Sequence, residues 1–136
     1  MRLFLFSLPL LALAPAACRT ATPHFNHADA NGNGHVTLAE WQRHIVTTLH
    51  AENDTNRDGR VTFEEWTSHN PGANRARFMK IDTDGDAAIS WAEGLKFVQD
   101  EKIYDDSFHR MDADGNGTLE RKEALHFRDL MATPGF

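Results

Sequence analysis

Apolar residues in this chain recur at helical spacing in stretches that alternate with acidic, glycine-containing segments. The clearest stripe, with members three or four residues apart, comprises Leu38, Trp41, Ile45 and Leu49. Such spacing places apolar side chains on one helix face. No Pro or Gly interrupts residues 41–53, so the pattern predicts a single helix over 38–53.

Further helices are predicted on both sides of a break at Asn70-Pro71-Gly72, near residues 63–69 and 73–81. After Gly94 no Pro or Gly occurs up to Met111, which predicts one long helix over 91–111. Its apolar face would contain Phe97, Tyr104, Phe108 and Met111.

The first and last helices of the chain are expected to differ in length. The first is a stub of about residues 24–28, and the last covers about residues 120–131, before Pro134-Gly135.

The segments between these helices repeat one pattern of oxygen-bearing side chains. They are loops 1 to 4, at residues 29–40, 54–65, 82–93 and 112–123. Each has Asp or Asn at positions 1, 3 and 5 and Glu at position 12. Position 6 is Gly in three loops and Ala87 in loop 3. This spacing surrounds a hard cation with oxygens, and the chain turns sharply at position 6.

The candidate ligands occupy positions 1, 3, 5, 7, 9 and 12 of each loop. In loops 1 and 2 they are Asp29, Asn31, Asn33, His35, Thr37, Glu40, Asp54, Asn56, Asp58, Arg60, Thr62 and Glu65. In loops 3 and 4 they are Asp82, Asp84, Asp86, Ala88, Ser90, Glu93, Asp112, Asp114, Asn116, Thr118, Glu120 and Glu123. Position 7 contributes only its backbone carbonyl, so the side chains of His35 and Arg60 are interpreted as solvated.

These loops resemble the calcium loops of the EF-hand superfamily, and the resemblance covers about residues 24–131. Position 8 is aliphatic in every loop: Val36, Val61, Ile89 and Leu119. In EF-hand proteins that residue forms a short β-bridge to a partner loop. The resemblance implies an all-α fold of four helix-loop-helix units in one compact domain, with up to four Ca²⁺ ions.

Linker length predicts which loops pair. Loops 1 and 2 would lie at opposite ends of the shared helix over 38–53 and could not easily pair. The break at 70–72 lets loops 2 and 3 fold together, which leaves loop 1 to pair with loop 4. Loop 1 has only two carboxylates, and Ala87 in loop 3 would need positive φ, so these two sites are predicted to bind calcium more weakly.

The short linkers and four loops also resemble lanmodulin, a bacterial periplasmic EF-hand family that binds lanthanides. That family favours Pro at position 2, where this chain has Ala30, Thr55, Thr83 and Ala113. It also favours an acid at position 9, where only Glu120 is acidic. The resemblance therefore supports the architecture more than the choice of metal.

The N-terminus predicts export. Residues 1–17 combine an early Arg2 with an apolar run and small residues, as a secretory signal peptide does. The run is too short to suggest a transmembrane span. Cys18, the single cysteine, is placed where a lipoprotein would carry its lipid anchor, although Pro15 departs from that pattern. A periplasmic or secreted bacterial protein is expected.

The remaining composition narrows the function. The formal net charge is −6 and no cluster of Lys and Arg stands out, which disfavours nucleic acid as a partner. No arrangement of nucleophile and base suggests an enzyme. Of eight histidines, His24 and His27 are the closest pair, but they lack a third ligand nearby and are interpreted as part of a solvated tail.

Three functions remain open on the sequence. The first is an exported calcium-binding protein that acts as a buffer or sensor by metal-coupled folding. The second is a lanthanide-selective periplasmic binder. The third is a calcium-stabilised interaction module that docks an envelope protein. Titration with each metal would separate the first two.

Overall fold

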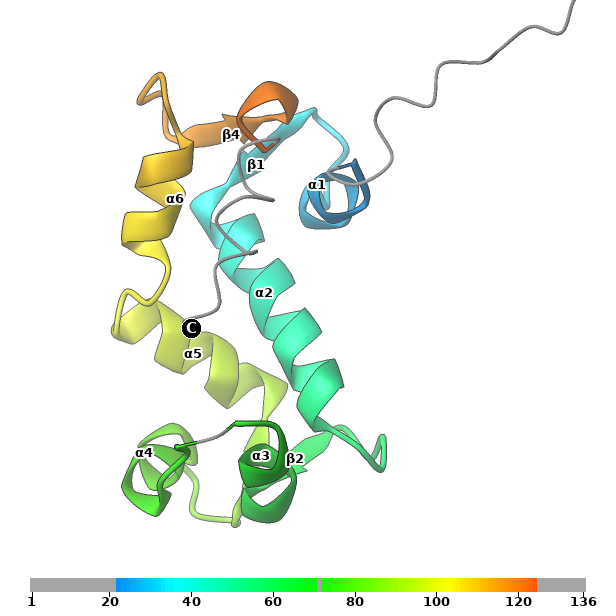
Figure 1. The fold of residues 1–136 in the computed structure, drawn as a ribbon, viewed down its shortest axis with the longest axis vertical. Helices are drawn as coiled ribbons and strands as arrows, with labels where there is room; N and C mark the ends of the chain where they lie inside the picture. Colours follow the sequence, from blue (N-terminus) through cyan, green and yellow to red (C-terminus); the bar gives the residue numbers. More distant parts are fainter. Residues whose placement is uncertain (1–21, 71, 125–136) are drawn as a thin grey trace, which may run out of the picture.

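The computed structural model describes residues 22–70 and 72–124. Short helices dominate, and each loop contains a short strand at its positions 7–9 (Figure 1). The elements are α1 (Thr22–Ala28), β1 (His35–Thr37), α2 (Leu38–Asn53), β2 (Arg60–Thr62), α3 (Phe63–His69), α4 (Arg75–Ile81), β3 (Ala88–Ser90), α5 (Trp91–Asp100), α6 (Asp105–Met111) and β4 (Thr118–Glu120). A mostly helical fold of this kind fits the predicted EF-hand class.

The strands form two separate antiparallel ladders. Strand β1 of loop 1 pairs with β4 of loop 4, and Val36 lies opposite Leu119. Strand β2 of loop 2 pairs with β3 of loop 3, and Val61 lies opposite Ile89. All four of these position-8 side chains are buried. Each ladder therefore ties two loops together through backbone hydrogen bonds and an apolar contact.

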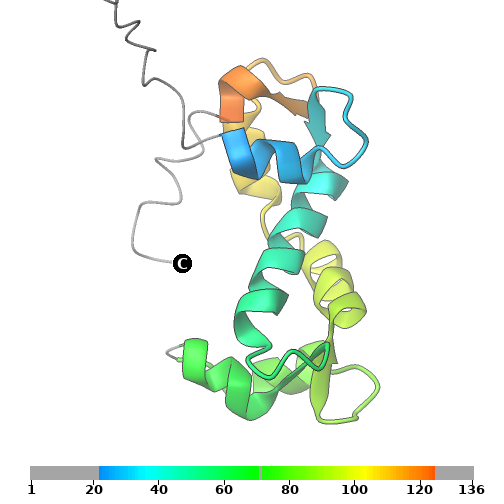
Figure 2. The ribbon, with the colours of Figure 1, turned by 90° about the vertical axis from the view of Figure 1, so that its right-hand side faces the viewer.

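Each ladder is associated with its own hydrophobic core. The outer lobe, around loops 1 and 4, buries Phe25, Ala28, Val36, Trp41, Ile45, Phe108, Met111, Leu119 and Ala124. The inner lobe, around loops 2 and 3, buries Val61, Phe78, Ile81 and Ile89, with Phe63, Trp66 and Phe97 packed against them. Figures 1 and 2 show the lobes at opposite ends of α2.

Helix α2 has the bounds that the sequence predicts. Thr37 caps its start, where the Thr37 hydroxyl accepts from the Glu40 amide and the Glu40 carboxylate accepts from the Thr37 amide. The predicted apolar stripe is partly wrong, because Leu49 is 42 % exposed. Val46 is buried instead and lies at the packing contact with α5, near Gly94.

The single helix predicted over 91–111 is wrong. The chain leaves helix α5 after Asp100, and both Lys102 (φ 51°) and Tyr104 (φ 79°) adopt left-handed conformations. The Lys102 amide donates to Gln99 O at 3.3 Å and the Ile103 amide to Val98 O at 3.0 Å. This pair of bonds is a Schellman motif, which usually has Gly where this chain has Lys102.

Because of this break, the apolar residues predicted to share one helix face pack in two different cores. Phe97, before the break, packs in the inner lobe, whereas Tyr104, Phe108 and Met111 pack in the outer lobe. A straight helix would have carried all four side chains along one side. Helices α5 and α6 therefore serve different lobes.

The ends of the chain are described only in part. Helix α1 begins at Thr22, slightly before the predicted stub, and the last helical turn starts after β4, at residue 121. The predicted signal peptide, Cys18 and the rest of the predicted last helix lie outside the described residues. Among the helices within 22–70 and 72–124, none is long and apolar enough to cross a bilayer.

Candidate metal centre

The position-1 aspartate of each loop organises the turn that follows it. In loop 4, the Asp112 carboxylate accepts from the amides of Asn116 (3.0 Å) and Gly117 (2.8 Å). Asp29 and Asp54 accept from the amides at positions 5 and 6 in the same way. These bonds curl the chain around the position-1 carboxylate.

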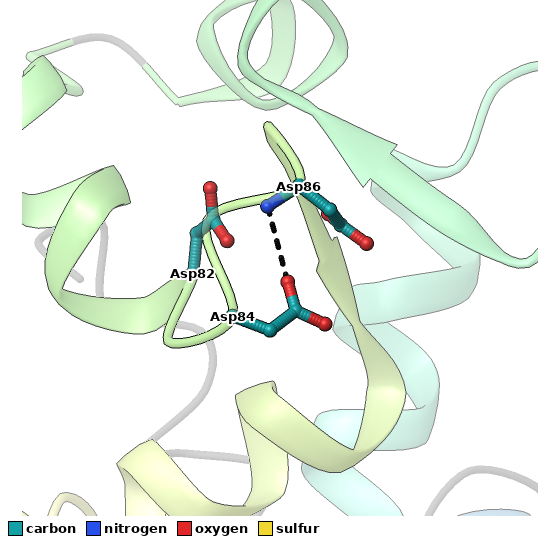
Figure 3. Close-up of side chains that lie close together, drawn as sticks. All are labelled: Asp82, Asp84 and Asp86. Atoms are coloured by element: carbon teal, nitrogen blue, oxygen red, sulfur yellow. Dashed lines mark hydrogen bonds between the residues drawn. The ribbon is translucent and has the colours of Figure 1, made fainter.

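Loop 3 differs from this arrangement. The Asp82 carboxylate accepts from the Gly85 amide at 2.8 Å and the Ala87 amide at 3.1 Å. The first of these donors is at position 4, whereas in the other loops it is at position 5. The Asp86 amide donates to Asp84 at 3.1 Å, as Figure 3 shows. Loop 3 therefore reaches a similar curl with a shifted hydrogen bond.

The position-12 glutamate closes each loop. In loop 3, Glu93 Oε1 accepts from the amides of Thr83 (2.8 Å) and Asp84 (3.2 Å), while Oε2 accepts from the Ser90 amide at 2.9 Å. Glu65 and Glu123 make the corresponding bonds in loops 2 and 4. Loop 1 uses a side chain instead: Asn31 Nδ2 donates to Glu40 Oε1 at 2.7 Å.

Position 9 has a structural role in three loops. Thr37, Thr62 and Ser90 are N-caps, and each hydroxyl donates to the glutamate three residues later at 2.8 Å. These are capping boxes that fix the start of each exit helix. The Ser/Thr-x-x-Glu pattern is visible in the sequence, but the ligand spacing alone had suggested only a metal-binding role for position 9.

The acidic ligands converge most clearly in loops 3 and 4. Carboxylate oxygens of Asp82, Asp84 and Asp86 lie within 4.8 Å of one another, and so do those of Asp112, Asp114 and Glu123. Calcium binds oxygen at about 2.3–2.6 Å, so two ligands of one ion are at most roughly 5 Å apart. The donor set and its spacing therefore fit a hard cation such as Ca²⁺.

Two positions in each loop have a left-handed backbone conformation. Position 6 has positive φ in all four: Gly34, Gly59, Ala87 (φ 70°) and Gly117. Position 4 also has positive φ, at Gly32, Arg57 (φ 61°), Gly85 and Gly115. A side chain in this region costs roughly 1–2 kcal/mol. The strain at Ala87 was predicted, whereas the demand at position 4 was missed, although three glycines there were a signal.

Two cations contact the candidate ligands. The Arg60 guanidinium of loop 2 forms an ion pair with Asp86 of loop 3. The Arg60 side chain is exposed, as the sequence predicts, but its pairing with Asp86 was not predicted, because it depends on the β2–β3 ladder that brings the two loops together. In loop 4, Lys122 Nζ lies 2.9 Å from Glu120 and 3.9 Å from Asp114. Both cations would compete with a metal ion bound by these carboxylates.

Hydrogen bonding keeps key ligands ionised. Burial opposes ionisation of Glu93, but bonds from Ser90, Asp84 and Thr83 outweigh it and lower the pKa of Glu93 to about 2. Burial likewise opposes ionisation of Asp112, yet amide donors led by Gly117 lower its pKa. Bonds from Thr62 lower the pKa of Glu65. The loops thus favour the charged, metal-binding form of these groups.

Comparison with known families agrees with this geometry. The EF hand family model matches residues 24–46, 54–68 and 103–123, which include loops 1, 2 and 4. These matches support membership of the EF-hand superfamily. Comparison with curated proteins finds no match. Loop 3, with Ala87 at position 6, lies outside the matched segments.

The EF-hand matches suggest calcium binding and support a metal ion as partner. They do not set the number of ions, and the assignment of the individual ligands stays a prediction. Each of the four loops nevertheless has its position-1 and position-12 carboxylates held by hydrogen bonds from within the same loop.

Proposed function

We propose that this chain is an exported calcium-binding EF-hand protein that buffers or senses calcium through metal-coupled folding. The convergence of Asp112, Asp114 and Glu123 in loop 4 carries the proposal, because Asp112 and Glu123 are buried carboxylates. Buried like charges repel one another until a cation neutralises them. Calcium would therefore stabilise the folded chain more than the unfolded chain.

The paired loops support a cooperative response. Binding in loop 4 would order β4, which pairs with β1 of loop 1. Binding in loop 3 would order β3, which pairs with β2 of loop 2. In this proposal four helix-loop-helix units act as two pairs, loops 1 with 4 and 2 with 3, and bind up to four ions. The ladder would couple metal binding in one loop of a pair to the order of the other loop.

A titration of the metal-stripped protein tests the proposal. Calcium, magnesium or lanthanum is added while helicity and tryptophan emission are followed. A rise in helicity at micromolar calcium supports a sensor or buffer, and a response only near millimolar supports a structural extracellular site. No response to calcium at any concentration would refute calcium-coupled folding.

A lanthanide-selective binder is the second candidate. The observation in its favour is that three aspartates, Asp82, Asp84 and Asp86, converge in loop 3, and a trivalent ion gains more from such charge than a divalent one. In the same titration this function predicts folding with lanthanum at concentrations many orders of magnitude below those needed with calcium. Comparable midpoints for the two ions would exclude lanthanide selectivity.

A further inference from the structure

Three histidine rings meet where α1 packs beside α2, outside the calcium loops. The ring centroids of His24 and His44 are 5.7 Å apart, and those of His27 and His44 are 6.3 Å apart. His24 and His27 are three residues apart on α1, so they share one helix face. His44 comes from α2 and supplies the third ring that the sequence around His24 lacks.

Helix α1 is fixed at this place. Phe25 and Ala28 are 4 % and 2 % exposed in the outer core. Arg121 donates to Asn26 Oδ1 at 3.0 Å, and its guanidinium carbon lies 5.3 Å from the Phe25 ring centroid. The interpretation of His24 and His27 as part of a solvated tail is therefore wrong, although both side chains remain exposed.

We propose that His24, His27 and His44 form a binding site for a transition-metal ion of the zinc, copper or nickel class. Imidazole nitrogen is a ligand that these ions favour, whereas the EF-hand loops offer only hard oxygen ligands. The two kinds of site would thus select different metals within one lobe.

The ring spacing is slightly wider than such an ion requires. Zinc binds imidazole nitrogen at about 2.0–2.1 Å, which places the ring centroids of two ligands of one tetrahedral ion roughly 5 Å apart. The observed 5.7 and 6.3 Å exceed this by about 1 Å. Side-chain rotation at the exposed His24 and His27 can close this gap while both helices keep their positions.

The surroundings of His44 disfavour a proton on its ring. Burial, then the neighbouring His24 and His27, lower the pKa of His44, so its ring is neutral and can offer a nitrogen lone pair. A hollow of about 260 Å³ beside His27 and His44 is lined by Ala30, Glu40 and Thr47 among others. It leaves space for a water molecule as an additional ligand.

A metal in this position would join α1 to α2 on either side of loop 1. Helix α1 enters loop 1 and α2 leaves it. The ion would hold the two helices at a fixed angle, as a bound calcium does from within the loop. Zinc is therefore expected to protect α1 from fraying.

Calorimetric titration of the full chain with zinc, at saturating calcium, tests the proposal. One zinc site is expected. Loss of an outer-shell partner alone weakens metal binding 10- to 100-fold, so loss of a direct ligand in His44→Gln should weaken it by about 100-fold. The matched control is His69→Gln on α3 of the inner lobe, which should leave zinc affinity unchanged. Zinc affinity that is equal in His44→Gln and the wild-type chain overturns the proposal.

Two further variants separate the histidine site from zinc binding elsewhere in the chain. The double variant His24→Gln/His27→Gln changes only exposed side chains and should abolish the site while the helicity of the calcium-bound chain stays normal. Cys18→Ser removes the thiol and should leave zinc binding intact. Zinc binding that survives the double variant but disappears in Cys18→Ser overturns the proposal. None of these changes alters a calcium ligand, so the result is independent of the proposed calcium function.

Discussion

In the outer lobe, every loop position with positive φ is a glycine, whereas the inner lobe has Arg57 and Ala87 at two of these positions. The outer lobe also has the larger core, which includes Phe25, Trp41 and Phe108. Four buried residues form the core of the inner lobe. The outer lobe is therefore expected to keep more of its structure without metal.

The inner lobe has more carboxylates among its candidate ligands than the outer lobe. At positions 1, 3, 5 and 12 the inner lobe carries Asp54, Asp58, Glu65, Asp82, Asp84, Asp86 and Glu93. The corresponding carboxylates of the outer lobe are Asp29, Glu40, Asp112, Asp114 and Glu123. The inner lobe thus begins from a more strained and more repulsive state and gains more when a cation binds. Glycine content and carboxylate number can therefore change the metal response of the same loop pattern independently.

The largest expected effect comes from the position-12 glutamates, one in each lobe. Glu123→Gln and Glu65→Gln should each lower the calcium affinity of their own loop by about 100-fold, because a bidentate carboxylate supplies two oxygens and a full charge. In loop 2, Gln can still serve at the Glu65 position of the capping box, so the exit helix α3 should persist. Calcium titration followed by amide NMR of each loop provides the measurement, and unchanged affinity in both variants would contradict the ligand assignment.

A smaller effect is expected from the strained backbone of loop 3. Ala87→Gly removes a side chain at φ 70° and should raise the calcium affinity of loop 3 by about five- to tenfold, the equivalent of roughly 1 kcal/mol. The matched change in the outer lobe is Gly34→Ala, where an added Cβ would meet nothing within 4 Å. It should weaken loop 1 by a similar factor, and a change of the same sign in both variants would refute backbone strain as the cause.

The two competing cations give a still smaller effect. Arg60→Gln should free Asp86 in the inner lobe and raise the calcium affinity of loop 3 by about two- to fivefold, since exposed ion pairs are weak. Lys122→Gln is the matched change beside Asp114 and Glu120 of the outer lobe. Both increases should fade in high salt. A fall in affinity in low salt would show that these cations assist the loops.

A different property, the acid stability of the metal-free inner lobe, tests the role of Glu93. The folded pKa of Glu93 is lowered from 4.5 to about 2, so its stabilising contribution is present above pH 4.5 and is lost as the pH falls towards 2. Glu93→Gln should flatten that part of the profile of unfolding free energy against pH. Urea unfolding in a chelating buffer at several pH values measures the slope, and an equally steep profile in the variant would contradict this role.

Local signals explain what the sequence predicted well. Helix α2 was predicted from residue 38 to 53 because its stripe and the absence of Pro and Gly agree. The loops were found from ligand spacing, which a metal centre imposes on any chain that forms it. Short helices α3 and α4 followed from the Pro71-Gly72 break.

The features that the sequence did not predict share a physical origin, because each depends on tertiary contacts. The break after Asp100 places Lys102 in a left-handed conformation that local preference disfavours, and it lets Phe97 and Tyr104 reach different cores. Arg60 meets Asp86 only because two distant loops pair. His44 joins His24 across α1 and α2, a proximity that spacing along the chain does not show.

Calorimetric titration of the metal-free full chain with calcium, with helicity measured at the same points, tests the central claim most directly. Metal-coupled folding predicts heat from more than one calcium ion together with a gain in helicity that is larger in the inner lobe. Absence of calcium uptake, or uptake that leaves helicity unchanged in both lobes, would contradict it.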